Sequence, residues 1–204
     1  MRLARYVIIL TLASLTGCAT GNTLVQPGVN SFGAMRVTAD DNWTKVSSEL
    51  TPSARKKSRT WTQDGLQNDR LIIIPSVEDG ESLFVSGNKS AALPVFHADM
   101  SQNEIEELVR SSIVKLLDEG QSVVKTSNQR SQGFGEHGGI MFDIDTAVTD
   151  GADYRGSAGA FVADEKLYMV LFLAAEPDYF SKHAARADEI IKSATLSVKT
   201  IRRY

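Results

Sequence analysis

Residues 167–175, LYMVLFLAA, constrain the fold of this chain more than any other segment. The segment contains no charged side chain, and its aromatic and β-branched residues favour an extended strand. Successive side chains of a strand point to opposite faces of a sheet, so this strand is apolar on both faces. Both faces need cover, which predicts a central strand in a sheet that is packed on both sides.

Earlier segments also have the composition and alternation of strands. Asp64-Gly65 is a turn dipeptide between two of them and predicts a slightly long hairpin, and Asp79-Gly80 marks a second turn. On the hairpin, we expect Trp61 to face the core. The predicted strands are Met35–Ala39, Trp43–Val46, Arg59–Thr62, Arg70–Ile74, Ser122–Ser131, Gly139–Val148 and Arg155–Ala163.

Two segments have the period of amphipathic helices. Residues 101–104, Ser-Gln-Asn-Glu, form a capping box, and the apolar face behind it continues to Leu117. Pro177 can occupy the first turn of a second helix, whose apolar stripe ends at Ala194. Strands in uninterrupted succession favour antiparallel pairing. The sequence therefore predicts an α+β fold, a mainly antiparallel sheet flanked by two amphipathic helices, in a single domain over residues 34–204.

Residues 1–17 have the pattern of a signal peptide. Arg2 and Arg5 precede an apolar run over residues 6–15, about half the roughly 20 residues that a membrane-spanning helix needs. The run ends in Leu15-Thr16-Gly17-Cys18, which resembles the lipobox of bacterial lipoproteins. That resemblance implies cleavage before Cys18, a diacylglycerol on its thiol and acylation of its new amino group. An ordinary secreted protein is the alternative.

Cys18 is the only cysteine in the chain, so no intrachain disulfide can form. A free thiol in an oxidising compartment would be reactive, and acylation removes that liability. Two or three acyl chains hold a protein stably on a bilayer. We therefore expect a cell-envelope protein that faces the periplasm and is anchored to a membrane through lipid on Cys18. Ala19, and not aspartate, follows Cys18, which by resemblance to enteric sorting favours the outer over the inner membrane.

Residues 18–33, CATGNTLVQPGVNSFG, lie between the lipid-bearing residue and the predicted domain. They are rich in glycine, asparagine and threonine and show no hydrophobic period. This composition predicts a flexible tether with a reach on the order of 20 Å.

The charge balance argues against a nucleic-acid partner. The chain has 22 Lys and Arg against 25 Asp and Glu, and removing residues 1–17, with two arginines and no acid, changes the net charge from −3 to −5. Nucleic-acid binding would require a clustered basic surface. Basic residues gather only at residues 55–59 and 199–203, where a solvated segment or contact with anionic headgroups would fit.

Gly133, Gly135 and Gly138 match the GxGxxG spacing of dinucleotide-binding loops. That motif functions where the glycines lead from a parallel strand into a helix whose N-terminus faces the pyrophosphate. Here they lead into residues 140–145, IMFDID, which alternate like a strand. We therefore expect a glycine-rich hairpin connection and no bound cofactor.

Candidate metal ligands and nucleophiles form no complete pattern. His137 precedes Asp143 and Asp145, which point to one face of a strand, but zinc and calcium need fuller ligand sets. His97 and His183 are isolated in the sequence. Ser112-Ile113-Val114-Lys115 fits the S-x-x-K spacing of serine acyl-enzymes without its companion motifs. We expect no metal and name no catalytic residue.

The last set of signals is spread across the predicted domain and consists of Trp61-Thr62, Asp64-Gly65-Leu66, Asp79-Gly80, Pro94, Phe96, Met100, Arg155-Gly156, Leu167-Tyr168, Tyr179-Phe180, Ile190 and Ser193. In these residues the chain resembles a group of uncharacterised proteobacterial lipoproteins. The order of strands and the closing helix are also similar to the PsbP-like superfamily, whose members carry an antiparallel sheet between helices. That resemblance implies a binding or assembly role without catalysis. The alternatives are an envelope hydrolase whose site assembles from distant residues and a carrier of a small ligand or ion.

Overall fold

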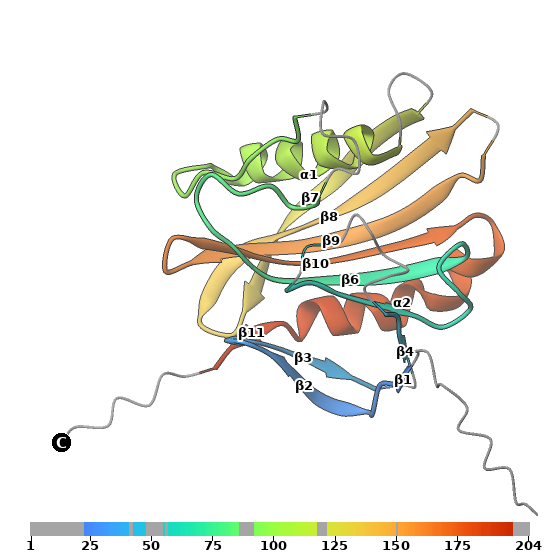
Figure 1. Ribbon diagram of the computed structural model, residues 1–204, viewed down its shortest axis with the longest axis horizontal. Helices are drawn as coiled ribbons and strands as arrows, with labels where there is room; N and C mark the ends of the chain where they lie inside the picture. The colour runs from blue at the N-terminus through green and yellow to red at the C-terminus, as the bar shows by residue number, and fades with distance from the viewer. Residues whose placement is uncertain are drawn as a thin grey trace, which may run out of the picture.

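The computed structural model describes residues 23–40, 43–47, 55, 57–85, 92–117, 122–149 and 151–197. Figure 1 shows four stacked layers: helix α1 (Gln102–Leu117), an eight-stranded sheet, helix α2 (Asp178–Lys192) and a three-stranded sheet. The large sheet therefore has one helix on each face, and the fold is α+β as predicted.

The central position of residues 167–175 is confirmed. Their strand pairs with neighbours on both sides, and nine of its ten residues are buried. Every pair in the large sheet is antiparallel. In spatial order its strands are β1 (Thr23–Leu24), β4 (Thr44–Lys45), β5 (Arg59–Thr62), β6 (Asp69–Val77), β10 (Lys166–Ala175), β9 (Tyr154–Ala163), β8 (His137–Val148) and β7 (Ser122–Phe134).

The helix signals also behave as predicted. At the start of α1, the Ser101 backbone N–H donates to the Glu104 carboxylate at 2.7 Å, and the Glu104 N–H lies 3.4 Å from the Ser101 hydroxyl. This reciprocal pair is the predicted capping box. Pro177, expected in the first turn of the second helix, instead lies one residue before α2 as its N-cap, and the peptide bond that joins it to Glu176 is cis.

Two apolar cores lie on opposite faces of the large sheet. The first fills the space under α1 and includes Leu108 and Phe142. The second lies between the sheet, α2 and the three-stranded sheet, and it includes Ile191. Trp61 is 1% exposed and packs in this second core with Leu71, so its predicted inward orientation is confirmed.

The predicted tether over residues 18–33 is wrong for residues 23–32. Residues 23 and 24 form β1, and Gly28–Phe32 form β2, which pairs with β3 (Met35–Ala39) beside β11 (Thr195–Leu196) in the three-stranded sheet. Val25 is 6% exposed and lies in the second core, and the Phe32 ring contacts Trp61 at 5.8 Å between centroids. The folded domain therefore includes residues 23–32, because these residues bury side chains and pair their backbone.

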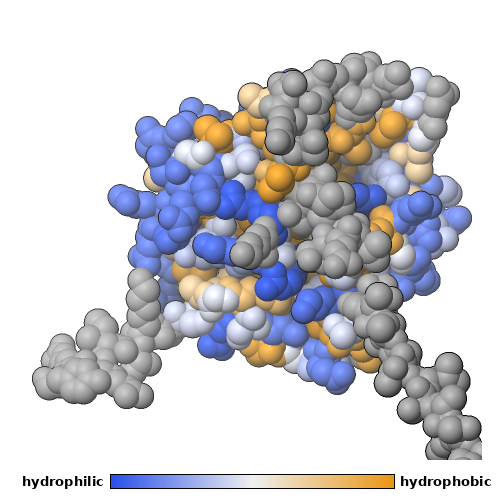
Figure 2. All heavy atoms as spheres, in the orientation of Figure 1, coloured by the Kyte–Doolittle hydropathy of each residue, from blue (hydrophilic) through white to orange (hydrophobic). Residues whose placement is uncertain are grey.

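Figure 2 shows hydrophilic residues on both flanks of the molecule, with hydrophobic residues reaching the surface toward the upper end and in smaller patches toward the lower end. The large hydrophobic side chains that are most exposed are Leu24, Val29, Val85 and Val123. None of the described helices is both long and apolar enough to cross a membrane.

Candidate functional site

The loop between β5 and β6 is built around a fully buried carboxylate, that of Asp69. It accepts hydrogen bonds from the Thr62 hydroxyl at 2.9 Å, the Gln63 N–H at 2.8 Å and the Asp64 N–H at 2.7 Å. The Thr62 oxygen in turn accepts from the Gly65 N–H at 2.8 Å. Gly65 has φ +100°, a conformation that favours glycine. These bonds place the Asp64 side chain outside the hairpin, facing α2.

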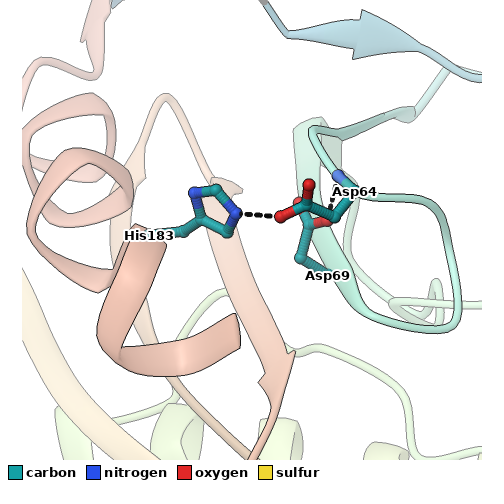
Figure 3. A group of neighbouring side chains, drawn as sticks. All are labelled: Asp64, Asp69 and His183. Carbon is teal, nitrogen blue, oxygen red and sulfur yellow. Dashed lines mark hydrogen bonds and ion pairs between the residues drawn. The ribbon is translucent and has the colours of Figure 1, made fainter. Parts of the chain in front are cut away.

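Asp64 joins this loop to α2, as Figure 3 shows. Its Oδ2 atom lies 2.6 Å from His183 Nε2 and 2.7 Å from Lys182 Nζ. An ionised carboxylate only accepts hydrogen bonds, so Nε2 of His183 carries the proton. The hydrogen bonds from Lys182 and His183 lower the pKa of the Asp64 carboxyl from its ordinary value. The three side chains form a charged link between segments 119 residues apart.

His183 is 2% exposed, and its ring lies 6.4 Å from the Trp43 ring between centroids. Within the described part of the chain, neither its Nδ1 atom nor the Trp43 Nε1 atom has a hydrogen-bond partner. His183 is isolated in the sequence because its partner, Asp64, is 119 residues away along the chain. One signal was available: His183 falls three residues after Phe180, on the buried side of the second helix.

Asp64, Asp69 and His183 offer three ligand atoms that all lie within 4.8 Å of one another. Three such ligands are the number that a catalytic zinc site uses. In this arrangement, however, the Lys182 ammonium lies beside Asp64 Oδ2, and Asp69 already accepts three hydrogen bonds. A cation would have to displace Lys182 and separate Asp64 from His183. The geometry therefore favours an internal ion-pair network that fixes α2 to the β5–β6 loop.

The opposite side of α2 forms one wall of an open cleft, and strands β7, β8 and β9 form the other. Two adjoining depressions of about 430 and 400 Å³ make up this charged cleft, and both are lined by Asp145 and Arg155. Basic side chains from Lys125, Arg130 and Lys192 also line it, alongside acidic ones. The cleft is thus polar, open and of mixed charge.

Arg155 lies at the junction of the two depressions. Its guanidinium group pairs with Asp145 at 2.9 Å and Glu176 at 3.3 Å, and it lies over the Phe180 ring at 4.8 Å. The Arg155 side chain is nevertheless 52% exposed. Contacts with two carboxylates and a ring orient the guanidinium, and its exposure leaves it accessible to a partner carboxylate.

Two further polar pairs line the cleft. Arg130 Nη1 lies 2.9 Å from Asp143 Oδ1, and the Ser157 hydroxyl donates to Asp188 at 2.5 Å. Nucleophilic catalysis by a serine uses a base such as histidine or lysine, and a carboxylate beside Ser157 is a weak base. Among the described residues that line the cleft there is no histidine, and the Lys192 ammonium is paired with Glu189 Oε1 at 3.0 Å. The arrangement suits recognition of charged groups better than acyl transfer.

The glycine motif lies in the connection between β7 and β8. Gly135 has φ +64° and begins the two-residue turn between Phe134 and His137, so the predicted glycine hairpin is confirmed. A Cβ atom on Gly139 would overlap the carbonyl of Ala160, which explains a glycine at this close approach. Because strands stand on both sides of the turn, the motif lacks the helix N-terminus that a dinucleotide loop uses.

The other sequence candidates are separated by the fold. His137 stacks on Phe161 at 5.9 Å between centroids, whereas Asp143 and Asp145 line the charged cleft. Ser112, from the S-x-x-K match, is 1% exposed on the buried side of α1, and its hydroxyl has no hydrogen-bond partner among the described residues. Cys18 lies outside the described residues.

No protein-family model matches the chain, and no curated protein matches its sequence. The structure is similar to the solution structure of cyanobacterial PsbP (CyanoP) from Synechocystis, with a TM-score of 0.58 at 12% identity over 90% of this chain and 99% of that chain. At this identity the likeness shows the fold alone, and the chain has a PsbP-like fold. The Saccharomyces cerevisiae Ran-binding protein Mog1p is less similar, with a TM-score of 0.44 at 9% identity over 86% of this chain and 95% of that chain.

Proposed function

We propose that this chain is a lipid-anchored bacterial cell-envelope protein that binds or assembles an envelope partner without catalysis. The lipid is attached to Cys18, and the protein faces the periplasm, with the outer membrane favoured over the inner. The lipobox-like Leu15-Thr16-Gly17-Cys18 and the single cysteine support the anchor. The proposal also places the chain in the group of uncharacterised proteobacterial lipoproteins that it resembles.

The charged cleft is the observation that supports the proposed binding role. Arg155 presents an oriented, half-exposed guanidinium between Asp145 and Glu176, and the Asp64 network holds α2 as the opposite wall. A partner segment that carries both a carboxylate and a basic side chain would exchange ion pairs with this surface. Such exchange gives orientation and selectivity more than raw affinity.

A carrier of a small polar ligand is a second candidate, favoured by the size of the cleft. Depressions of about 430 and 400 Å³ fall within the range of 300–1,000 Å³ that is usual for small-molecule sites. Such sites are mostly apolar and enclosed, whereas this cleft is open and charged. The protein-partner role therefore fits its character better.

The anchor is tested by the substitution Cys18→Ala. This variant lacks the thiol that would accept the diacylglycerol, so it should lose palmitate labelling and remain uncut by the lipoprotein signal peptidase. A Ser112→Ala variant, changed at a distant hydroxyl, serves as the control and should label normally. Membrane attachment that survives in Cys18→Ala would contradict the proposal.

The partner is tested by site-specific photocrosslinking in intact cells. A crosslinking residue at Asn128, in the cleft, should capture an envelope protein, whereas one at Asn103, on α1, should not. A second substitution, Arg155→Glu, should abolish the capture because it reverses the charge at the junction of the cleft. If capture persists unchanged in Arg155→Glu, the cleft is not the binding surface.

A further inference from the structure

Strand β7 forms one edge of the large sheet, beside α1 (Figure 1). It pairs with β8 on one side, and none of the described strands pairs with its other side. An edge strand presents a row of backbone N–H and C=O groups with which another extended chain can pair. The opposite edge strand, β1, has only two residues, whereas β7 has 13. Of the two edges, β7 therefore offers the longer surface for an added strand.

The first half of β7 keeps the regular geometry that an added strand requires. Residues 122–127 pair one for one with residues 143–148 of β8, and the register shifts between Ser127 and Arg130. Asn128, at this bulge, has φ +54°, and its side-chain amide donates to Asp143 at 2.9 Å. Because a bulge disrupts regular pairing, a docked strand would be limited to residues 122–127.

Two side chains of this segment point into the charged cleft. Val123 and Lys125 both line it, and both are exposed, Val123 to 55%. Val124, between them, points to the opposite face of the sheet and is buried in the core under α1. The charged cleft therefore extends to the edge of the sheet, where an apolar and a cationic side chain lie two residues apart.

Lys125 ends a row of alternating charge across three strands. It lies opposite Asp145 on β8, and Asp145 lies opposite Arg155 on β9. Asp145 pairs with Arg155 at 2.9 Å, and Lys125 forms no ion pair with any described residue. Side chains directly opposite each other on antiparallel strands are close enough for opposite charges to attract and like charges to repel. A carboxylate on an added strand would continue the alternation and pair with Lys125.

Charge also favours a partner segment over a second copy of the chain. Strand β7 carries Lys125 and Arg130 and no acidic residue, so a second β7 at the same edge would bring further positive charge. The carboxylates that line the cleft near Lys125 are already engaged, Glu176 with Arg155 and Asp153 with a backbone N–H. The unpaired charge at this edge is therefore cationic and fits an acidic segment.

We propose that the envelope partner adds an extended segment to the large sheet along residues 122–127 of β7, with an aspartate or glutamate beside Lys125 and an apolar side chain beside Val123. This inference rests on the proposed binding role of the charged cleft and adds the way in which the partner is held. The added strand is antiparallel, as are the described pairs of this sheet, so the partner reads acidic-x-apolar from N- to C-terminus. Backbone hydrogen bonds supply the affinity, and alternate side chains supply the specificity.

The test uses the full chain, processed in bacteria and purified in detergent. The probe is the synthetic peptide Thr-Thr-Glu-Thr-Val-Thr, whose glutamate falls beside Lys125 and whose valine falls beside Val123 in antiparallel pairing with residues 122–127. A second peptide has lysine in place of the glutamate. Hydrogen exchange followed by mass spectrometry reports the protection of backbone N–H groups, and the fluorescence anisotropy of a dye on the peptide reports its affinity.

We expect the glutamate peptide to slow exchange severalfold in residues 122–127 and to leave α1 unchanged, because only the edge strand gains hydrogen-bond partners. The lysine peptide should bind about tenfold more weakly, since a repulsive pair replaces an attractive one. Equal binding of the two peptides would overturn the role given to Lys125. Unchanged exchange in residues 122–127 would overturn strand addition and identify Lys125 and the bulge as protection of the edge against pairing.

The substitution Lys125→Glu should reverse the preference, so that this variant binds the lysine peptide better than the glutamate peptide. Lys45→Glu is the matched control, because Lys45 is an exposed lysine on a strand near the opposite edge of the same sheet. It should keep the wild-type preference. Unchanged melting temperatures show that both variants fold. A wild-type preference in Lys125→Glu would contradict the proposal.

The binding role of the cleft and strand addition can fail separately. In intact cells, a crosslinking residue at Val123 should capture the same envelope protein as one at Asn128, and Lys125→Glu should reduce both captures. Capture at Asn128 that requires Arg155 but is unchanged in Lys125→Glu would retain the cleft as the binding surface and overturn strand addition. No capture at Asn128 would overturn the binding role, and this inference with it. Capture of a second copy of the chain at Val123 would assign the edge to self-association and overturn the proposal.

Discussion

Removing the buried carboxylate of Asp69 should strongly destabilise the protein. Asp69 is fully buried, and its two oxygen atoms accept one hydroxyl and two backbone N–H groups from the β5–β6 loop. In Asp69→Ala those three donors lose their acceptor. In Asp69→Asn the shape of the side chain is kept, but its NH₂ group replaces one of the two acceptor oxygens. That NH₂ group then faces at least one backbone N–H, and two donors cannot form a hydrogen bond.

The expected loss in the free energy of unfolding follows from the hydrogen bonds that are removed. A hydrogen bond to a charged group contributes about 1.5–3 kcal/mol, and a partly buried donor left unpaired costs about 1–3 kcal/mol. Because the Gln63 and Asp64 N–H groups lie near the surface, water can replace part of this loss. We expect about 4 kcal/mol for Asp69→Ala and about 2 kcal/mol for Asp69→Asn. For a domain of this size, 4 kcal/mol corresponds to a melting temperature lower by roughly 8–16 °C.

The measurement is urea unfolding at neutral pH of a chain that begins at Gly21, with the slope of the transition compared between variants. Asp99→Asn is the matched control, since Asp99 is exposed, and it should change stability by less than about 0.5 kcal/mol. An Asp69→Asn variant as stable as the Asp99→Asn control would refute the reasoning. Because Asp69 positions Asp64, the losses in Asp69→Asn and His183→Asn should be non-additive by at least about 0.5 kcal/mol.

Three further changes test other parts of the fold. Trp61→Ala should cost about 3–5 kcal/mol, since Trp61 is 1% exposed, and a melting temperature near that of the wild type would contradict its core position. Gly156→Ala should prevent stable folding, because a Cβ there overlaps the carbonyl of Phe172, while Gly133→Ala, where a Cβ meets nothing within 4 Å, should fold normally in circular dichroism. Lys182→Met should lower stability by up to about 1 kcal/mol at pH 7. The lowered pKa of the Asp64 carboxyl means that its stabilisation is present above an unfolded pKa of about 3.9 and is lost as the pH falls through the folded pKa. The stability difference between Lys182→Met and the wild type should therefore decrease in thermal melts as the pH is lowered below about 3.9.

The local sequence pattern was sufficient to predict both helices and most strands of the large sheet. Residues 167–175 form a central strand, and the Ser101–Glu104 capping box starts α1, as predicted. Such features depend on neighbouring residues, because alternation and capping are set within a few positions of the chain. The Asp64-Gly65 turn belongs to this class as well, since φ +100° at Gly65 is a local requirement.

Of the three-stranded sheet, β3 was predicted, but β2 and β11 could not be found in this way. Gly28–Phe32 alternate between half-buried and exposed positions, but their half-buried residues include a glycine and an asparagine, which give no hydrophobic period. The strand exists because β3 offers it a partner and because Phe32 packs on Trp61. Composition alone therefore indicated a tether where tertiary pairing produces a strand.

By itself, the sequence determined the period of both helices and of most strands in the large sheet, the turns at Asp64-Gly65 and Gly135 and, through Cys18, the prediction of a lipid anchor. The contact between Asp64 and His183, 119 residues apart, and the charged cleft around Arg155 were decided only by the tertiary structure. The physical reason is that a pair of remote side chains meets only when strand register and helix packing bring their elements together. Each of those depends on many residues at once, so no spacing within the sequence encodes the distance between the two side chains.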